Sequence, residues 1–497
     1  MCDGFFARME DLGQAVTYGE VRLKTGFSQI PPAQVSLETR FSRRVSLKMP
    51  VVSAAMDTVT ESGMAIAIAQ LGGIGVIHRN LSPEEQRNEA RRVKYHLSGM
   101  ISSPITVTEA MTFNEINVMR KERNFPFHSF PVLDAGGKLV GIITQNDFDF
   151  CGDLSQTTSQ VMTRDLITAG SETTVDEAYA IMQNAKKKVL PLVDAEGHLA
   201  GMYLYSDLKR IKSGTSSGFS LDAQARLQVA AAVGTGDDAL RRVELLGSYV
   251  DVIVIDTAHG DSQAVFDTLR EIKRNSDLDV VVGNVSEGSS AHRLVYAGAD
   301  GIKVGQGPGS ICTTRIIAGI GCPQVTAVYN VVHALEGTDV PVCADGGIEY
   351  SGDITIAIGA GAHTVMMGKL LAGTEEAPGE AEFHSGRWMK SYRGMGSLAA
   401  MKANLSSRQR YRQTDDAPGK LVPEGIEATV PHIGGLATIM YQYLGGLRAG
   451  MGYVGAATIQ ELREKADFYR ISAVGMAESH PHGVQAVGDA PNYRFAE

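Results

Sequence analysis

The sequence predicts a parallel (β/α)8 barrel into which a smaller domain is inserted. Three observations support this fold class. Short apolar runs alternate with helical patterns toward both ends of the chain, which is typical of parallel β/α units. Eight such runs can be counted, and eight units close a barrel. A segment that occurs twice separates the second run from the third. The 497 residues, 43% of them apolar, suffice for one large and one smaller core.

The eight apolar runs predict the barrel strands in chain order. They are 48–54 (KMPVVSA), 72–78 (GGIGVIH), 226–233 (RLQVAAAV), 250–258 (VDVIVIDTA), 278–284 (LDVVVGN), 299–305 (ADGIKVG), 340–347 (VPVCADGG) and 362–368 (AHTVMMG). Helical patterns such as 61–72, 262–274 and 289–298 lie between them. Active sites of such barrels assemble at the C-terminal ends of the strands. Five candidate residues fall there: Asp256, Asn284, Gly305, Asp345 and Gly368.

The duplicated segment reads FPVLDAGGKLVGIITQNDF at 130–148 and LPLVDAEGHLAGMYLYSDL at 190–208. Each copy follows a helical pattern and contains two apolar strands joined by a turn. The pair resembles a tandem of cystathionine-β-synthase-type (CBS) modules, a Bateman domain. The expected domains are therefore 1–99 and 213–497 for the two parts of the barrel and 100–212 for the CBS pair.

The CBS resemblance implies binding of adenine or guanine nucleotides such as ATP or GTP, through a Thr/Ser-x-x-Asp element that reaches the ribose. The first copy carries this element at Thr144 and Asp147. The second keeps Asp207 but has Leu204 where the hydroxyl is expected. A purely structural insertion remains an equal alternative to a nucleotide sensor.

Charge and cysteine content exclude several classes of protein. The net charge of −10 argues against nucleic-acid binding. The five cysteines include no CxxC pair and no cluster at zinc spacing, so disulfides and structural zinc are not expected. No run of eighteen apolar residues and no targeting signature occurs, and a cytoplasmic protein without membrane contact is expected.

Two glycine-bearing turns predict a phosphate site. ADGGI at 344–348 and MMGKLL at 366–371 follow the seventh and eighth strands, the recurrent phosphate position of these barrels. Glycine lets backbone amides approach a phosphate closely, although tight turns alone also require glycine. Asp345 stands between the turns, where it can accept hydrogen bonds from ribose hydroxyls. A phosphorylated sugar derivative is the expected ligand.

Cys312 lies in GPGSICTTR at 307–315, after the sixth strand. A lone cysteine is usually a small buried hydrophobe. The glycine-rich loop, the position at the barrel rim and the nearby Thr314 favour a nucleophile instead, since a thiolate is a strong one. Cys322 and Cys343, by contrast, are expected to be structural.

Ordered motifs along nearly the whole chain carry a second resemblance. VVSAAMDTVTESGMAIAIAQLGGIGVIHRN, GPGSICTTR, YRGMGSLAAM and ESHPHGVQ resemble the inosine monophosphate (IMP) dehydrogenase and guanosine monophosphate (GMP) reductase family. The resemblance implies that Cys312 attacks C2 of the purine and that hydride leaves for a nicotinamide. A thioimidate intermediate is then hydrolysed to xanthosine monophosphate (XMP).

The resemblance also implies the ligand contacts. The phosphate cradle would be Ser310, Gly347, Gly368 and Tyr392, and the base would be held by Met395, Gly396 and Glu424. NAD would be bound through its nicotinamide ribose by Asp256, Thr257, Ala258 and Asn284, with Gly305 beside them. A potassium site would use the carbonyls of Gly307, Gly309 and Cys312, completed by a neighbour's Glu478, Ser479 and His480. This arrangement implies a homotetramer, and octamers are left open.

The flap, which we define as residues 402–419, bears on the choice between the two family activities. In the dehydrogenase an Arg-Tyr pair enters the vacated dinucleotide site and activates water, and Arg410 and Tyr411 match that pair. Arginine is effectively always protonated, so a relay through Thr314 and Glu424 is an alternative path for the proton. The sequence departs from the family pattern at three places: an extra residue precedes Arg410, and Lys369 and Gln306 replace the usual residues. Because of these departures, a CBS-bearing GMP reductase that uses NADPH is the alternative. A catalytically inactive nucleotide-sensing protein is the other.

Overall fold

The computed structural model describes residues 2–96, 100–101, 104–122, 125, 127–212, 218–411, 413, 419–484, 490 and 492–493. The chain forms two compact units. The first comprises Met1–Lys94, Gly218–Asp222 and Leu227–Glu497, and the second comprises Tyr95–Ser217 and Ala223–Arg226. Each unit has its own core, and each is described separately below.

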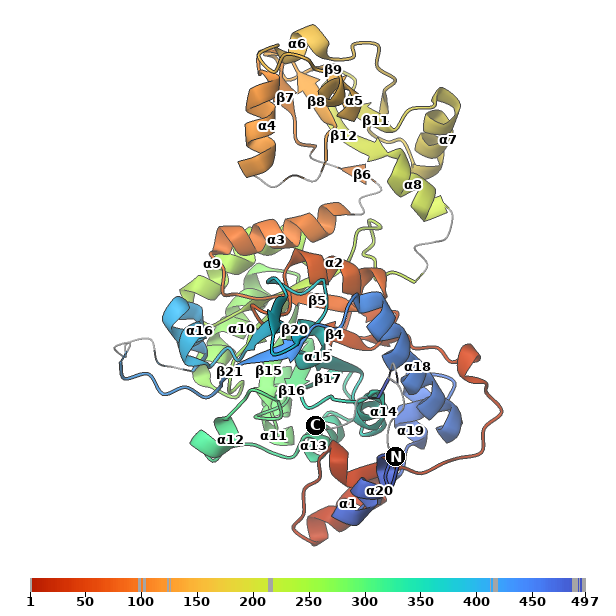
Figure 1. Ribbon diagram of the computed structural model, residues 1–497, viewed down its shortest axis with the longest axis vertical. Helices are drawn as coiled ribbons and strands as arrows, with labels where there is room; N and C mark the ends of the chain where they lie inside the picture. The colour runs from red at the N-terminus through yellow and green to blue at the C-terminus, as the bar shows by residue number, and fades with distance from the viewer. Residues whose placement is uncertain are drawn as a thin grey trace. The chain divides into compact units, whose positions relative to one another are not determined.

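The first unit is a closed (β/α)8 TIM barrel (Figure 1). Each of the eight predicted runs contains one barrel strand, so the predicted fold class is confirmed. The strands are β4 (Val51–Ser53), β5 (Ile74–Ile77), β13 (Val229–Val233), β14 (Val252–Asp256), β15 (Asp279–Val285), β16 (Gly301–Val304), β17 (Val342–Asp345) and β18 (Thr364–Met367). All neighbours are parallel, and β5 pairs directly with β13. The second unit therefore interrupts the chain but not the barrel sheet.

Apolar side chains fill the barrel. The cluster includes Val52, Val76, Ala232, Val254, Val281, Cys343 and Met366, one or more from most strands. Phe41 and Leu47, from the hairpin of β2 (Thr39–Arg40) and β3 (Ser46–Leu47), belong to the same cluster. Cys343 is fully buried here, and burial raises its thiol pKa to about 12. It is structural, as expected.

Helices surround the strands (Figure 1). They include α2 (Ser62–Gln70), α3 (Pro83–His96), α9 (Asp237–Leu246), α10 (Gln263–Asn275), α11 (Gly288–Tyr296), α13 (Gln324–Ala334) and α14 (Ser351–Gly359). In α10 the buried residues are Val265, Thr268, Leu269 and Ile272, the i, i+3, i+4, i+7 spacing of one helix face. This pattern explains why the segment is a helix that packs on the sheet.

The second unit consists of two similar halves, so the predicted repeat is present in the structure. The first half runs β7 (Val107–Thr108), α4 (Phe113–Glu122), β8 (Phe130–Leu133), β9 (Leu139–Ile143) and α5 (Gln145–Asp149). The second runs β10 (Ala169–Gly170), α7 (Val175–Ala185), β11 (Val189–Val193), β12 (Leu199–Leu204) and α8 (Tyr205–Lys212). In both halves the first two strands are parallel and the last two antiparallel, with a register shift in the antiparallel pair.

The predicted ribose element has a local structural role in the first half. Thr144 donates from its backbone N–H and its hydroxyl to the Asp147 carboxylate at 2.7 and 2.9 Å, which caps α5. In the second half Asp207 is buried, and burial raises its carboxyl pKa to about 6. Whether either half binds a nucleotide stays a prediction. In the described part of the chain no helix has the length and hydropathy needed to cross a membrane.

Candidate active site

Cys312 lies in the loop between β16 and α12 (Thr314–Ile317). Its Sγ atom donates a hydrogen bond to Oγ1 of Thr314 at 3.2 Å, and that hydroxyl donates to Oε2 of Glu424 at 2.8 Å. A thiol, a hydroxyl and a carboxylate therefore form one continuous hydrogen-bonded chain. A proton that leaves the thiol has a path toward a carboxylate, as activation of a nucleophile requires.

Backbone hydrogen bonds hold Glu424 against the cysteine loop. The N–H of Thr313 donates to the Glu424 carbonyl at 3.0 Å, and the N–H of Ile426 donates to the Ile311 carbonyl at 3.0 Å. Glu424 in turn donates its N–H to the carbonyl of Gly396 at 3.1 Å. Segments that are about a hundred residues apart in the chain are thereby fixed side by side. This pairing explains how Glu424 and Gly396 reach the cysteine.

The flap pair enters the same cavity. Arg410 and Tyr411 stand at the end of α17 (Leu405–Arg410) and line the cavity together with Cys312 and Met395. Arg410 Nη1 forms an ion pair with Oδ2 of Asp256. Burial raises the pKa of the Tyr411 hydroxyl above its usual value. The structure therefore brings the predicted Arg-Tyr pair to the predicted nucleophile.

The Tyr411 ring also explains why residue 396 is glycine. A Cβ atom at Gly396 would collide with the ring carbons of Tyr411. A side chain at residue 396 would therefore displace the Tyr411 ring from its observed position.

A lysine that the sequence analysis did not single out lies at the centre of the site. Lys303, on β16, is 1% exposed, and its Nζ atom donates to Asp256 Oδ1 at 2.9 Å and to Asp345 Oδ2 at 2.6 Å. It also donates to Oδ1 of Asn284. The signal was available in ADGIKVG, because a lysine inside an otherwise buried strand requires charged partners.

Asn284 connects the predicted nucleotide and dinucleotide residues. Its Nδ2 atom donates to the Gly305 carbonyl at 2.7 Å and to Asp345 Oδ2 at 2.9 Å. Thr257 donates from its hydroxyl to the Gly283 carbonyl at 2.8 Å, while its own carbonyl accepts the N–H of Asn284. Asp256, Thr257, Ala258, Asn284 and Gly305 all line the Cys312 cavity.

Gln306, one of the departures from the family pattern, is hydrogen-bonded beside these residues. Its Oε1 atom accepts from Ser286 at 2.8 Å, and its Nε2 atom contacts His259 Nδ1 at 3.2 Å. The extra flap residue, Gln409, is contacted by the buried Arg79 at 3.5 Å. Both departures therefore have partners at the rim.

Two of the predicted phosphate residues, Ser310 and Gly368, lie next to Tyr392. A Cβ atom at Gly368 would lie 3.0 Å from the Tyr392 hydroxyl, so Gly368 permits this close approach. Burial, partly offset by a hydrogen bond with Ser310, raises the Tyr392 pKa to about 12. Gly347 has φ +83° and lies beside Tyr18 and Pro308. Lys369 points to the surface, where Nζ contacts Glu349 at 3.2 Å.

The six predicted potassium residues fall into two groups. Gly307, Gly309 and Cys312 line the catalytic cavity. Glu478 and Ser479 end α20 (Ala473–Ser479), and His480 follows it, with its Nδ1 atom 2.7 Å from the Tyr493 hydroxyl. Ser479 and His480 line a different cavity of the same chain. Completion of the site by a neighbouring copy stays a prediction.

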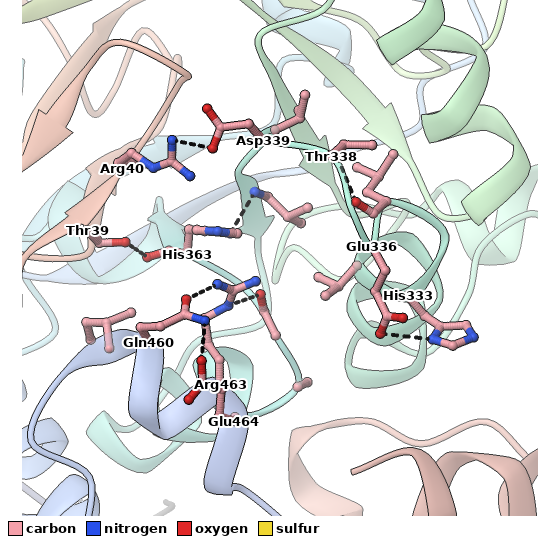
Figure 2. A pocket seen from close by; sticks show the side chains of 18 of the residues that line it. Thr39, Arg40, His333, Glu336, Thr338, Asp339, His363, Gln460, Arg463 and Glu464 are labelled. Carbon is pink, nitrogen blue, oxygen red and sulfur yellow. Dashed lines mark hydrogen bonds and ion pairs between the residues drawn. The ribbon is translucent and has the colours of Figure 1, made fainter. Parts of the chain in front are cut away.

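The Cys312 cavity has a volume of about 140 Å³, and the flap residues Arg410 and Tyr411 form part of its lining. A second cavity in the barrel unit has a volume of about 660 Å³ and contains none of the predicted site residues (Figure 2). Arg40 bonds Asp339 there at 2.8 Å, and Arg463 donates to the Gly361 carbonyl at 2.8 Å. The volume of a cavity therefore does not identify the site in this protein.

His363 of this second cavity predicts a loss of stability in acid. Its Nδ1 atom accepts the Val342 N–H at 3.1 Å, and burial, followed by Arg463 and Arg40, holds its pKa well below 6.5. Below pH 6.5 the unfolded chain therefore binds more protons than the folded one, and the free energy of unfolding falls as the pH drops. We expect His363→Gln to reduce this slope by up to about 1.4 kcal/mol per pH unit in denaturant titrations.

The matched control is His333→Gln, which changes an exposed histidine of the same cavity and should retain the wild-type slope. Parallel pH slopes for wild type and His363→Gln would contradict the prediction.

A parallel barrel that carries the predicted nucleophile, its hydrogen-bonded carboxylate and the predicted phosphate turns at one rim is typical of an enzyme that acts on phosphorylated small molecules. The chain belongs to the IMP dehydrogenase and GMP reductase family, since the model of the IMP dehydrogenase / GMP reductase domain matches residues 15–482. It is thus an oxidoreductase.

Individual relatives agree with the family assignment. The inosine-5'-monophosphate dehydrogenase of Aquifex aeolicus is 48% identical over 486 residues, covering 97% of this chain and 98% of the relative. The enzyme of the same name from Escherichia coli K12 is 47% identical with the same coverage. A GMP reductase variant from Trypanosoma brucei, solved in complex with guanosine 5'-monophosphate, superposes with a TM-score of 0.87 at 37% identity. That match covers 95% of this chain and 98% of the reductase.

Proposed function

We propose that this chain oxidises IMP to XMP, with NAD as the hydride acceptor. The observation that carries the proposal is the position of Arg410 and Tyr411 in the cavity of Cys312, against Asp256. A reaction that ends with hydrolysis needs such a pair to position water, whereas a reductase does not. The curated dehydrogenases at 45–48% identity support the same choice.

The nucleotide would be held at three points. Ser310, Gly347, Gly368 and Tyr392 would bind the phosphate, and Asp345 would accept from the ribose hydroxyls. Met395, Gly396 and Glu424 would hold the base next to Cys312. Rigid support at all three points is what allows a carbon atom to be presented to a nucleophile in a reactive geometry.

The residues around Asp256 fit the ribose of a nicotinamide dinucleotide. Lys303 fixes one oxygen of this carboxylate, while the ion pair to the other oxygen comes from Arg410, a flap residue. The Nε atom of Arg410 is buried and has no hydrogen-bond partner among the described residues. The docked position therefore leaves one donor of this guanidinium without an acceptor among those residues. An acidic ribose ligand favours NAD over its phosphorylated form. The bound dinucleotide would supply an electrophilic ring that accepts hydride.

Cys312 would begin the reaction. Its Sγ atom forms a bond to C2 of the purine while the thiol proton passes toward Thr314 and Glu424. The hydrogen on C2 then leaves with its electron pair, which restores the C2=N3 double bond and gives the thioimidate. Because the base is held by a covalent bond at this stage, its position is fixed for the second half of the reaction.

Hydrolysis would complete the cycle. Arg410 and Tyr411, docked against Asp256, position a water molecule at C2. The proton taken from the thiol passes to solvent before this step, so that the Thr314–Glu424 pair is free to accept another. The water oxygen then bonds to C2, one of its hydrogens goes to N3 and the other passes as a proton to the pair, and the C2–S bond breaks to release XMP, with its C2 carbonyl, and the thiolate. Arginine is a poor proton acceptor, so we assign the proton to the hydroxyl–carboxylate pair and the positioning to Arg410.

Two further proposals concern partners. The repeated halves of the second unit would bind ATP or GTP, as the CBS resemblance implies. A potassium ion would bind the carbonyls of Gly307, Gly309 and Cys312 in a homotetramer. Potassium-dependent activity and a tetrameric mass in solution are the results expected.

A paired absorbance assay tests the proposed function. The purified protein is offered IMP with NAD in potassium buffer and, separately, GMP with NADPH. We expect NAD reduction with IMP. NADPH oxidation with release of ammonia would assign the chain to the reductases instead, as the solved structure of a GMP reductase relative allows. No reaction in either direction would favour an inactive nucleotide-sensing protein, which the intact Cys312–Thr314–Glu424 chain argues against.

A further inference from the structure

Lys303 is a single cation shared by two acids of different ligand sites. In the proposed function Asp256 binds the dinucleotide and Asp345 binds the nucleotide, and each carboxylate contacts the same ammonium group within 3 Å. All three side chains are buried or nearly so. Because buried charges interact strongly, an imbalance among them is not screened by water as it would be at the surface.

Arg410 balances this cluster when the flap is docked. Its ion pair with Asp256 gives each of the two acids a cation of its own. Two further charges lie nearby: Glu424 lines the same cavity, and the pKa of the buried Arg79 guanidinium is lowered first by burial and second by Arg410. Asp256 and Asp345 therefore contact two cations, Lys303 and Arg410, with the flap docked, and departure of Arg410 leaves one of these two acids in excess.

We propose that Lys303 is a positioning residue that keeps this cluster one positive charge short, so that it accepts in turn Arg410 and the cationic ring of oxidised nicotinamide. The inference rests on the proposed function, which puts the nicotinamide ribose at Asp256. The proposal gives a physical reason why Arg410 and the dinucleotide exchange. When Arg410 departs, the cluster lacks one positive charge, and the oxidised nicotinamide ring supplies it.

The same count explains when the exchange reverses. A hydride carries two electrons and one proton, so its transfer from C2 cancels the positive charge of the ring. Asp256 and Asp345 then again share Lys303 alone, and the cluster favours the return of Arg410 over retention of the reduced dinucleotide. Docking of the flap, which hydrolysis needs, is thereby coupled to completion of the redox step.

Equilibrium binding tests the proposal through the ratio of the Kd values of NAD and NADH. On a Cys312→Ala background, which prevents turnover, the Kd values of NAD and NADH are measured calorimetrically with IMP present. Docking of the flap competes equally with both forms, so it cancels from the ratio of the two constants. We expect Lys303→Met to increase the preference for NAD over NADH by about tenfold, because the unbalanced negative charge grows.

Two variants keep the test decisive if Lys303→Met folds poorly. Lys303→Arg preserves the charge and should leave the ratio near that of the background protein. Asp345→Asn removes one acid and should shift the ratio in the opposite direction, toward equal affinity. Lys390→Met is the matched control, since Lys390 is a buried lysine whose Nζ atom contacts only the carbonyls of Thr374 and Ala377 among its described partners.

The proposal would be overturned if Lys303→Met and Asp345→Asn lost affinity for NAD and NADH in equal measure, so that the ratio of the two Kd values did not change. Lys303 would then be a structural residue. Failure of the proposed function is a different result. It would appear in the parent protein as an absence of NAD reduction with IMP.

Discussion

Replacement of Cys312 by alanine is expected to lower kcat by roughly 10³-fold or more, while IMP still binds. In the proposed reaction the thiol forms the bond to C2, and its hydrogen bond to Thr314 gives its proton a path to Glu424. The phosphate residues around Tyr392 do not depend on it. Steady-state assays measure the loss, and calorimetry with IMP measures the retained affinity.

Cys322→Ala is the control for this prediction. Cys322 follows the same loop, but burial raises its pKa to about 11, so it is not a nucleophile at neutral pH. We expect nearly full activity from this variant. A Cys312→Ala protein with substantial turnover would refute the covalent route and with it the assignment of the loop.

Replacement of Arg410 by alanine should slow hydrolysis far more than hydride transfer. The guanidinium is paired with Asp256 in the docked flap, so its removal leaves the water at C2 with Tyr411 alone of its two proposed positioning partners. Losing one such group costs about 10²-fold to 10³-fold in the step that uses it. We expect a rapid burst of NADH followed by slow turnover, with the thioimidate accumulating on Cys312, where mass spectrometry of the quenched protein detects it.

Arg408→Ala is the matched control, because Arg408 lies on the same helix and donates to the Met401 carbonyl at 2.8 Å rather than to a site residue. It should show no burst and near-normal turnover. Equal slowing of hydride transfer and hydrolysis in Arg410→Ala would defeat the proposed role of the flap pair.

The strand pattern could be predicted from the sequence because barrel strands are buried on both faces. Each therefore appears as a short, continuous apolar run, as in VDVIVID, that a surface element would not show. The duplicated halves could be predicted because a turn and two strands recur with the same residues. The position of Cys312 at the rim followed from the fold, since every loop after a barrel strand reaches that rim.

The contacts inside the site could not be predicted in the same way. The ion pairs of Lys303 with Asp256 and Asp345 join β16 to β14 and to its direct neighbour β17. The order of these strands follows from the fold, but no local pattern encodes which of their polar side chains contact one another. The placement of Glu424 came from the family resemblance. Its physical cause, the ladder of backbone hydrogen bonds to Thr313 and Ile311, is independent of side-chain identity and so leaves no signature in the sequence.

The flap is anchored at both ends by the ladder that holds Glu424. The Gly394 N–H donates to the Ile426 carbonyl at 3.0 Å, so the chain that enters the flap and the chain that leaves it are already joined. Movement of the flap therefore involves no loop-closure entropy. Its cost is the ordering of the intervening residues, about 1–2 kcal/mol for each backbone that becomes fixed. A modest number of docking contacts can offset such a cost, and the backbone hydrogen bonds that join Glu424 to Thr313 and Gly396 involve no flap residue.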